Sequence, residues 1–364
     1  MKSLKDVREI RLYFFGNEAE KQKLYEQFVI PYLTETGIVF HLERDWYGGP
    51  NYRLITTDES FDAQSFRRRI AQASYEYFGE LNQEQLLANI EAYIKNTATV
   101  SEMERRDDKE ISLTDHLQIY DQRIDQAYVK KRFNSFQHFR LHTESLFKFQ
   151  SFINQHMKFV SGLSREEKLL YMMRAMYDVL SVSQFEDKYS VLVYISNIEG
   201  VFAIAESMGM RERYLQIYNQ MYNSLNPPRF FELEEYKTSF GKDWILMIQA
   251  IHRQITEQLS ILSEDEEGYY SQEEQYELLR QNISDINSDF HNELREKNLE
   301  ELLEHEEHQI FKLLINIVYK AIHMLGIPFN DRNAACYFVC RYVLERNNTS
   351  WDEILEERGE DFAF

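Results

Sequence analysis

The chain has 364 residues and a mass of 43.9 kDa, enough for two domains or for one large domain with a substantial core. It carries 41 basic and 61 acidic side chains, and the resulting formal charge of -20 disfavours a generic surface for binding duplex nucleic acid. Tyr (24) and Phe (25) are abundant whereas Gly (12) and Pro (5) are scarce, which is typical of long helices packed with aromatic side chains.

The cysteine content and the N-terminal segment indicate the compartment. Cys336 and Cys340 are four residues apart in a helical pattern, too few and too close for a disulfide framework, so we expect both to be reduced and buried. Residues 1–15 lack the apolar segment of a signal peptide, and no window approaches about 18 uninterrupted apolar residues. These features predict a cytoplasmic protein with no membrane span.

The N-terminal part has the pattern of a small sheet. Residues 8–15, 38–46 and 51–57 predict strands, because polar and apolar side chains alternate there and turn residues punctuate them. Between the first two, residues 18–36 have helical spacing, with a kink or break expected at Pro31. We expect a sheet backed by this helix.

Beyond Ser60 the pattern is helical almost to the C-terminus, and the fold class predicted is α+β, a small β-rich module followed by a mainly helical body. We expect a strand-containing module over residues 1–100 and the helical body over residues 101–364, forming one compact catalytic unit. The predicted helices cover residues 60–79, 82–98, 136–162, 164–183, 187–208, 209–225, 229–262, 271–304, 306–325, 331–346 and 350–358.

One histidine pair raises the question of a metal. His305 and His308 share a helix face with Glu301 and Glu304, but the spacing is not the HExxH of zinc peptidases, and charge-rich helices often carry such groups on solvated faces. No GxGxxG, P-loop or GxSxG element occurs in the chain. The sequence therefore predicts neither a metal nor a cofactor.

Two basic segments stand out in this acidic chain. Residues 130–132, Lys-Lys-Arg, are followed by phenylalanines at 133, 136 and 139, so the segment could hold an anionic peptide or an RNA end. The alternative, which periodicity favours, is an amphipathic segment whose phenylalanines enter the core. Arg67, Arg68 and Arg69 form a weaker patch, because consecutive helical residues point in different directions.

The turn at residues 48–50, Gly-Gly-Pro, precedes the most informative strand. Alternation places Asn51 and Arg53 on one face and Tyr52 on the other. A guanidinium fixed on a strand is suited to clamp a carboxylate or to polarise an amide carbonyl. On periodicity alone, however, a surface arginine beside a hairpin is the favoured interpretation.

This strand also carries a resemblance. Residues 49–54 read Gly-Pro-Asn-Tyr-Arg-Leu and resemble the Gly-Pro-His-x-Arg-Leu-Arg of stand-alone lantibiotic-dehydratase C-terminal domains, also called thiopeptide-type bacteriocin biosynthesis proteins. Asn51 replaces the histidine, and Ile55 stands where a second arginine is common. Residues 322–327 are similar to the late His-Met and Leu-Gly segment of the family, and the resemblance covers most of the chain in length and order.

The resemblance implies an enzyme that modifies a ribosomally made precursor peptide. Members eliminate glutamate from glutamylated Ser or Thr, join two dehydroalanines by a formal [4+2] cycloaddition that closes a pyridine-centred macrocycle and expels the leader, or take part in adding amino acids from aminoacyl-tRNA. Residues 120–128 lack the Arg-Tyr-Gly-Gly of the eliminating members. In this respect the chain resembles the pyridine synthases.

What the resemblance implies for single residues is a set of expectations. Arg53 would polarise a carbonyl, His323 would transfer a proton, and Tyr52 or Tyr47 would be a phenolic donor. The partners expected are a precursor peptide with its leader, bound beside the strand module, and possible further enzymes of the same pathway. The substrate-binding residues expected are Asn51, Arg67, Arg68, Lys130 and Arg132.

Two alternatives remain open at this point. One is a glutamate lyase that works in a split dehydratase. The other is a non-catalytic helical protein whose aromatic side chains form grooves for a partner. The products formed from a precursor peptide would separate all three.

Overall fold

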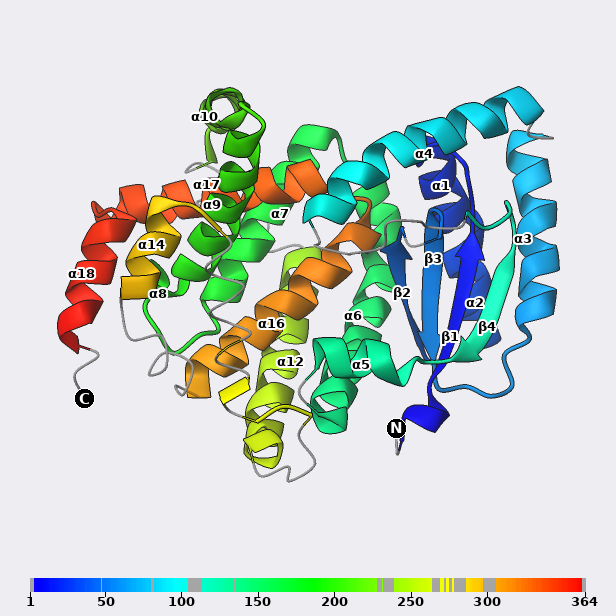
Figure 1. Ribbon diagram of the computed structural model, residues 1–364, viewed down its shortest axis with the longest axis horizontal. Coiled ribbons are helices and arrows are strands. Elements are labelled where there is room, and N and C mark those ends of the chain that lie inside the picture. Colours follow the sequence, from blue (N-terminus) through cyan, green and yellow to red (C-terminus); the bar gives the residue numbers. More distant parts are fainter. Residues whose placement is uncertain are drawn as a thin grey trace. The chain divides into compact units, whose positions relative to one another are not determined.

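The computed structural model confirms the predicted fold class: a small antiparallel sheet near the N-terminus is followed by a mainly helical body (Figure 1). The structure describes residues 3–46, 48–79, 82–103, 113–133, 135–227, 231, 239–263, 269–271, 273–274, 277, 286–296 and 306–361.

The chain forms two compact units, which are described separately. The first unit comprises Met1–Ser161 and Lys320–Gly326, and the second comprises Gly162–Tyr319 and Ile327–Phe364. This division differs from the expected boundary near residue 100. The reason is that a strand at Ile119–Arg123 pairs with the sheet and keeps this part of the chain in the first unit.

The sheet has the order β2-β3-β1-β4, and all neighbours are antiparallel. Strands β1 (Arg8–Tyr13), β2 (Phe40–Asp45) and β3 (Asn51–Thr56) confirm the three predicted strands. Strand β4 (Ile119–Arg123) was not predicted, because only its first residue is buried and it therefore lacks apolar alternation.

Both sides of β2 are occupied. On one side it pairs with β3, and on the other the backbone N–H of Leu42 donates to Gln150 Oε1 at 2.9 Å, from helix α6 (Phe136–Ser161). Figure 1 shows α6 running alongside β2. The helix thus covers an edge whose backbone groups would otherwise be free to pair with another strand.

The helix predicted at 18–36 contains an irregular turn at its proline. It consists of α1 (Glu18–Leu24), a π-helical turn η2 (Tyr25–Val29) and α2 (Ile30–Thr36), with Pro31 in the first turn of α2. Pro31 has no N–H to donate to the preceding turn, and the wider π turn accommodates this loss. Gly37 ends the helix at φ 70°, a left-handed conformation that favours glycine.

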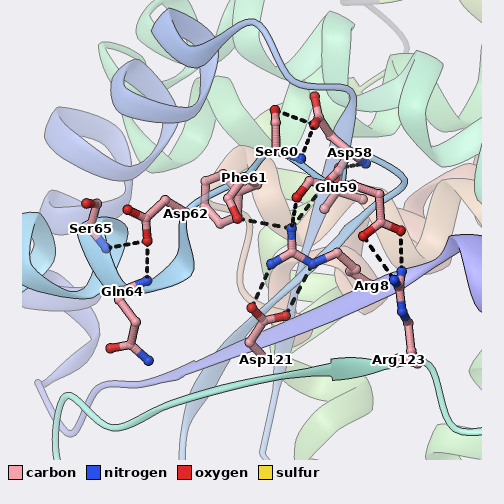
Figure 2. A network of polar contacts seen from close by, with 11 residues as sticks. Arg8, Asp58, Glu59, Ser60, Phe61, Asp62, Gln64, Ser65, Asp121 and Arg123 are labelled. Atoms are coloured by element: carbon pink, nitrogen blue, oxygen red, sulfur yellow. Dashed lines mark hydrogen bonds and ion pairs between the residues drawn. The ribbon is translucent and has the colours of Figure 1, made fainter.

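Arg8 fixes the loop between β3 and helix α3 (Ala63–Phe78), as Figure 2 shows. Its Nη1 donates to the carbonyl oxygens of residues 58, 59 and 61 at 3.0 to 3.2 Å, and its Nε and Nη2 donate to Asp121 on β4. One guanidinium therefore joins β1, β4 and the start of α3, where Asp62 caps the helix through the N–H groups of residues 64 and 65.

The second unit is built of helices. Helix α17 packs against α7, α9 and α10, and its buried face includes Ala334, Ala335 and Cys336. Small side chains there allow the neighbouring helices to approach closely. The bounds are α7 Arg165–Leu180, α8 Asp187–Ser190, α9 Leu192–Ser207, α10 Arg211–Leu225, α12 Ser239–Ser263, α14 Asp289–Glu296, α16 Glu306–Ile322, α17 Phe329–Asn347 and α18 Trp351–Asp361. The last residues of α16, from Lys320 on, belong to the first unit.

The remaining helix predictions agree with this arrangement where it is described. In the first unit lie α4 (Gln83–Met103) and α5 (Gln126–Arg132). The helix predicted at 271–304 falls largely outside the described residues, and only α14 represents it.

Cys336 and Cys340 are both free and buried, and burial raises the pKa of the Cys336 thiol to about 11.

One helical stretch, Asp187–Ser207, is long and apolar enough to cross a membrane by length and composition alone. Core helices of globular proteins meet the same criterion. In this chain the stretch includes α9, which packs against α17 and buries Tyr194, Ile198 and Phe202. We therefore assign it to the core of the second unit.

Replacing Arg8 by Met should lower the free energy of unfolding by about 2 kcal/mol, because a largely buried cation that satisfies three carbonyl groups and Asp121 would be lost. Urea titration measures this change. The matched control is Arg123→Met, which removes an exposed ion pair to Glu59 from the same cluster and should leave stability within experimental error. Equal effects of the two substitutions would contradict the role given to Arg8.

Candidate functional site

One face of the sheet carries charged side chains in place of an apolar surface. The strand register places Glu43 of β2 and Arg11 of β1 on either side of Arg53 of β3. Two residues along each strand, it places His41 of β2 and Glu9 of β1 on either side of Ile55. Because side chains alternate along a strand, all of them point to the same side. We call this surface the charged face; it consists of Glu9, Arg11, His41, Glu43, Asp45 and Arg53.

Arg53 lies at the centre of the charged face and is 3% exposed. Its Nη2 donates to Glu9 Oε2 at 3.1 Å, and its Nη1 donates to Glu43 Oε2 at 3.2 Å and to the Tyr128 hydroxyl at 2.8 Å. Its Nε is also buried and has no hydrogen-bond partner among the described residues. The guanidinium therefore fixes two carboxylates and a phenol, and its Nε–H remains without an acceptor among the described residues.

Lys320 supplies a further cation from a distant part of the sequence. It lies near the end of α16, within the first unit, and its Nζ is 2.8 Å from Glu43 Oε1. Burial alone would raise the pKa of Glu43, but Lys320 and Arg53 outweigh burial and hold this pKa well below its usual range. Glu43 is therefore ionised at neutral pH.

The other carboxylates are compensated in the same way. Burial raises the pKa of Glu9, whereas the charges and hydrogen bonds of Arg53 and Arg11 lower it, and the net result is a lowered pKa. Arg11 also lies 3.4 Å from Asp45. Three cations and three carboxylates thus alternate across the sheet and between the sheet and Lys320, so the charges balance locally.

Two buried histidines beside these charges are neutral. Burial lowers the pKa of His41 to about 3, although Glu43, 3.5 Å from its Nδ1, acts in the opposite direction. Burial and the charge of Lys320 hold the pKa of His142 on α6 well below its usual value. Neutral imidazoles can accept or donate a hydrogen bond without adding a fourth cation.

Tyr128 on α5 is the phenol at this site. Its ring lies between two guanidiniums, with the central carbon of Arg53 4.3 Å and that of Arg132 4.7 Å from the ring centroid. Arg53 donates to the phenol oxygen, so the phenolic hydrogen remains able to donate to a further acceptor. The side chain is half-buried, whereas Arg53 is buried, and Tyr128 is thus the more accessible of the two.

The structure brings together only part of the residue set expected from the sequence. Arg53 has the face expected, and Asn51 lies on the same face, where its amide donates to the Gly49 carbonyl at 3.0 Å and so fixes the turn. His323 lies in the short helix η4 (His323–Leu325), in the first unit, where η4 packs against β2 and α6. Its side chain is half-buried. A catalytic role for each remains a prediction.

Tyr52 does not share a surface with Arg53. Alternation puts it on the opposite face of β3, where its hydroxyl donates to the Lys21 carbonyl at 2.6 Å and its ring stacks on Tyr25. The Tyr52 hydroxyl therefore lies on the face of the sheet opposite to Arg53, and its role as a phenolic donor stays a prediction. Tyr47, the other expected phenol, lies outside the described residues.

The expected basic residues occupy separate places. Arg67 Nε donates to the Leu117 carbonyl at 2.9 Å, and Arg68 donates to Ser65 within its own helix. Lys130 and Arg132 lie in the last turn of α5, where cations also stabilise the helix dipole. Arg132 contacts the site through the ring of Tyr128. A role of these residues in substrate binding remains a prediction.

Several residues of the site were not singled out from the sequence, namely Glu9, Glu43, Lys320, Tyr128 and His41. A signal existed for part of this set: charged or polar residues at every second position of three neighbouring strands predict one polar face. No local pattern indicates Lys320 or Tyr128, because each reaches the sheet only through the tertiary fold.

A metal centre is not apparent in the part of the chain that the structure describes. No group of three or more His, Cys, Asp or Glu side chains there is arranged to hold a metal ion. Of the histidine pair considered from the sequence, His305 lies outside the described residues. Glu307 between them is buried and accepts a hydrogen bond from the backbone of residue 184.

The buried histidines predict how stability depends on pH. Between pH 6.5 and about 3 the unfolded chain binds a proton at residue 41 that the folded chain does not, so stability should fall as the pH decreases through this window. The variant His41→Phe should lose this contribution, about 1.4 kcal/mol per pH unit at most. Urea titrations of both proteins across the window measure the difference, and parallel pH profiles would contradict a neutral His41.

Comparisons with known proteins address the fold. No family model and no curated protein matches the chain. Among solved structures, the chain is similar to the pyridine synthase TbtD from thiomuracin biosynthesis, with a TM-score of 0.55, 13% identity, and coverage of 93% of this chain and 98% of that one. It is also similar to TsrL, with a TM-score of 0.62, 12% identity, and coverage of 96% and 97%. The chain therefore shares, over nearly its whole length, the fold of a thiopeptide-type biosynthesis protein.

Proposed function

We propose that this protein is an enzyme that modifies a ribosomally synthesised precursor peptide, and that it joins two dehydroalanines of that peptide by a formal [4+2] cycloaddition. The observation that carries the proposal is the likeness to the pyridine synthase TbtD across almost all of both chains. The charged face supports it, because it offers a fixed donor set of the kind that such a reaction needs.

The reaction needs proton movements more than it needs a nucleophile. A proton moves from the nitrogen to the oxygen of one amide, which creates a 2-azadiene, and two carbon–carbon bonds then form with the second dehydroalanine. Loss of water and of the leader as a carboxamide gives the pyridine. Donors that favour the imidic acid and assist both departures accelerate these steps, and holding the two alkenes in contact supplies several kcal/mol more.

Tyr128 is the group to which we assign the donor role at the reacting amide. Arg53 orients it through the 2.8 Å hydrogen bond to its oxygen and stacks on its ring. Glu9 and Glu43 in turn hold Arg53, so the guanidinium that orients the phenol cannot move without breaking buried ion pairs. Arg53 is therefore a positioning residue, with its Nε as a further donor, and this changes the direct role expected from the sequence.

His323 is the second proton-transfer group of this proposal. Its helix η4 follows Lys320 by a few residues and packs on β2, the strand that carries Glu43. The proposal also includes a cytoplasmic location, recognition of the leader beside the sheet, and the absence of a cofactor. The substrate is a precursor peptide that already contains dehydroalanines, so other enzymes of the same pathway must act first.

The reaction class is tested by one incubation analysed by mass spectrometry. The substrate is a leader-bearing peptide with two dehydroalanines, taken from the same gene neighbourhood, and the expected products are a released leader and a pyridine macrocycle. Glutamate loss from a glutamylated Ser or Thr peptide would replace the cycloaddition by elimination. No change in either peptide would contradict an enzyme of this class and favour the non-catalytic helical scaffold.

The variant Tyr128→Phe tests the site. It keeps the ring between the two arginines but removes the donor, so kcat should fall about a hundredfold with little change in KM. The matched control is Tyr75→Phe on the exposed surface of α3, which should retain full turnover. Arg53 is unsuited to this test because its removal would leave two buried carboxylates uncompensated. Full turnover by Tyr128→Phe would remove Tyr128 from the mechanism.

A further inference from the structure

The second unit contains a pocket, and none of the residues that line it is assigned to catalysis. It is formed by α7, α10 and the first turns of α17, and its volume is about 300 Å³. That volume accommodates one large side chain rather than a folded partner. The apolar part of its wall consists of Met210, Ile217, Met221 and Ala334.

Tyr218 gives this pocket an unsatisfied polar group. The residue is 3% exposed and lines the pocket, and its buried hydroxyl has no hydrogen-bond partner among the described residues. Burial and nearby Tyr214 raise the pKa of Tyr218, so the phenol is neutral and can donate. A buried hydroxyl without a partner costs free energy, and an acceptor on a ligand would remove that cost.

The rim of the pocket adds a charge preference. Arg165 donates to both carboxylate oxygens of Asp331, at 2.6 and 3.0 Å, so these two charges neutralise each other. Arg213 is exposed, also lines the pocket, and has no ion pair with a described residue. Its charge is thus available to a carboxylate, whereas the chain as a whole has a charge of -20.

We propose that this pocket binds a peptide segment in which an apolar side chain lies next to an acidic residue. The apolar side chain packs against the methionines, a carbonyl of the peptide accepts from Tyr218, and the carboxylate pairs with Arg213. Methionine suits such a site, because its flexible thioether adapts to apolar side chains of different shape. The inference rests on the proposed function only in taking the ligand to be a peptide.

The methionines also report on binding. In protein labelled with ¹³C at the methionine methyl groups, the Met210 and Met221 signals are assigned by the variants Met210→Leu and Met221→Leu. Titration with millimolar N-acetyl-Glu-Leu-amide should shift both signals while that of buried Met176 stays in place. N-acetyl-Gln-Leu-amide, which lacks the charge, and N-acetyl-Glu-Ala-amide, which lacks the apolar side chain, should each bind more weakly. Unmoved signals with the first peptide, or equal affinities for all three, would overturn the proposal.

Matched variants separate the two polar contacts. Tyr218→Phe should weaken binding about fivefold, as expected for the loss of one hydrogen bond, whereas Tyr222→Phe, whose hydroxyl contacts Glu345 instead, should not. Arg213→Gln should weaken binding of the Glu peptide about threefold and leave the Gln peptide unaffected. The control Arg211→Gln changes the net charge equally. Because Arg211 pairs with Glu199 and Glu206, its replacement should not change the affinity for either peptide. Any control that weakens binding as much as its partner variant would refute the assigned contact.

Failure of this inference is distinguishable from failure of the proposed function. Binding of N-acetyl-Glu-Leu-amide requires no turnover, so shifted methionine signals without a pyridine product would keep the pocket and reject the cycloaddition. The opposite outcome is turnover whose KM is unchanged by Tyr218→Phe and Arg213→Gln, together with unmoved methionine signals. It would support the proposed reaction and contradict peptide binding in the pocket.

Discussion

The sheet depends on one buried cation. Arg53 is 3% exposed, and placing its charge there carries a desolvation cost that only close carboxylates can offset. Glu9 on β1 and Glu43 on β2 provide them, so the guanidinium joins its own strand, β3, to both neighbouring strands. A shift of either neighbouring strand by one residue would move its carboxylate to the apolar face, and the ion pairs thereby help to fix the register.

Stability alone does not account for such a face. Apolar side chains of similar volume often stabilise a core as well as a buried ion pair does, or better. What the charges add is orientation: Arg53 holds the Tyr128 oxygen at 2.8 Å, and Lys320 and Arg53 hold Glu43 from two sides. Groups fixed in this way need little reorganisation when charge develops on a substrate, and this advantage is the reason we assign chemistry to the charged face.

The sequence was informative wherever a local pattern determines geometry. Alternation alone predicted that Asn51 and Arg53 face one way and Tyr52 the other, and the strand confirms it. The edge strand β4 was not predicted, because polar side chains on both of its faces remove that alternation. Lys320 could not be foreseen, since its partner Glu43 is about three quarters of the chain away and only tertiary packing brings them together. Tyr128 could not be foreseen either, because α5 brings its hydroxyl to Arg53 from 75 residues along the chain.

Two tyrosines illustrate how one side chain can serve two purposes in this chain. Tyr128 is half-buried and held by cations, so its hydroxyl has a defined direction at the charged face. Tyr218 is buried in an apolar pocket without a partner among the described residues, so its hydroxyl gains most from a ligand that brings an acceptor. A peptide-modifying enzyme can use both, because binding energy from residues that do not react offsets the cost of ordering those that do. Under these proposals, loss of the Tyr128 hydroxyl lowers kcat, whereas loss of the Tyr218 hydroxyl weakens peptide binding.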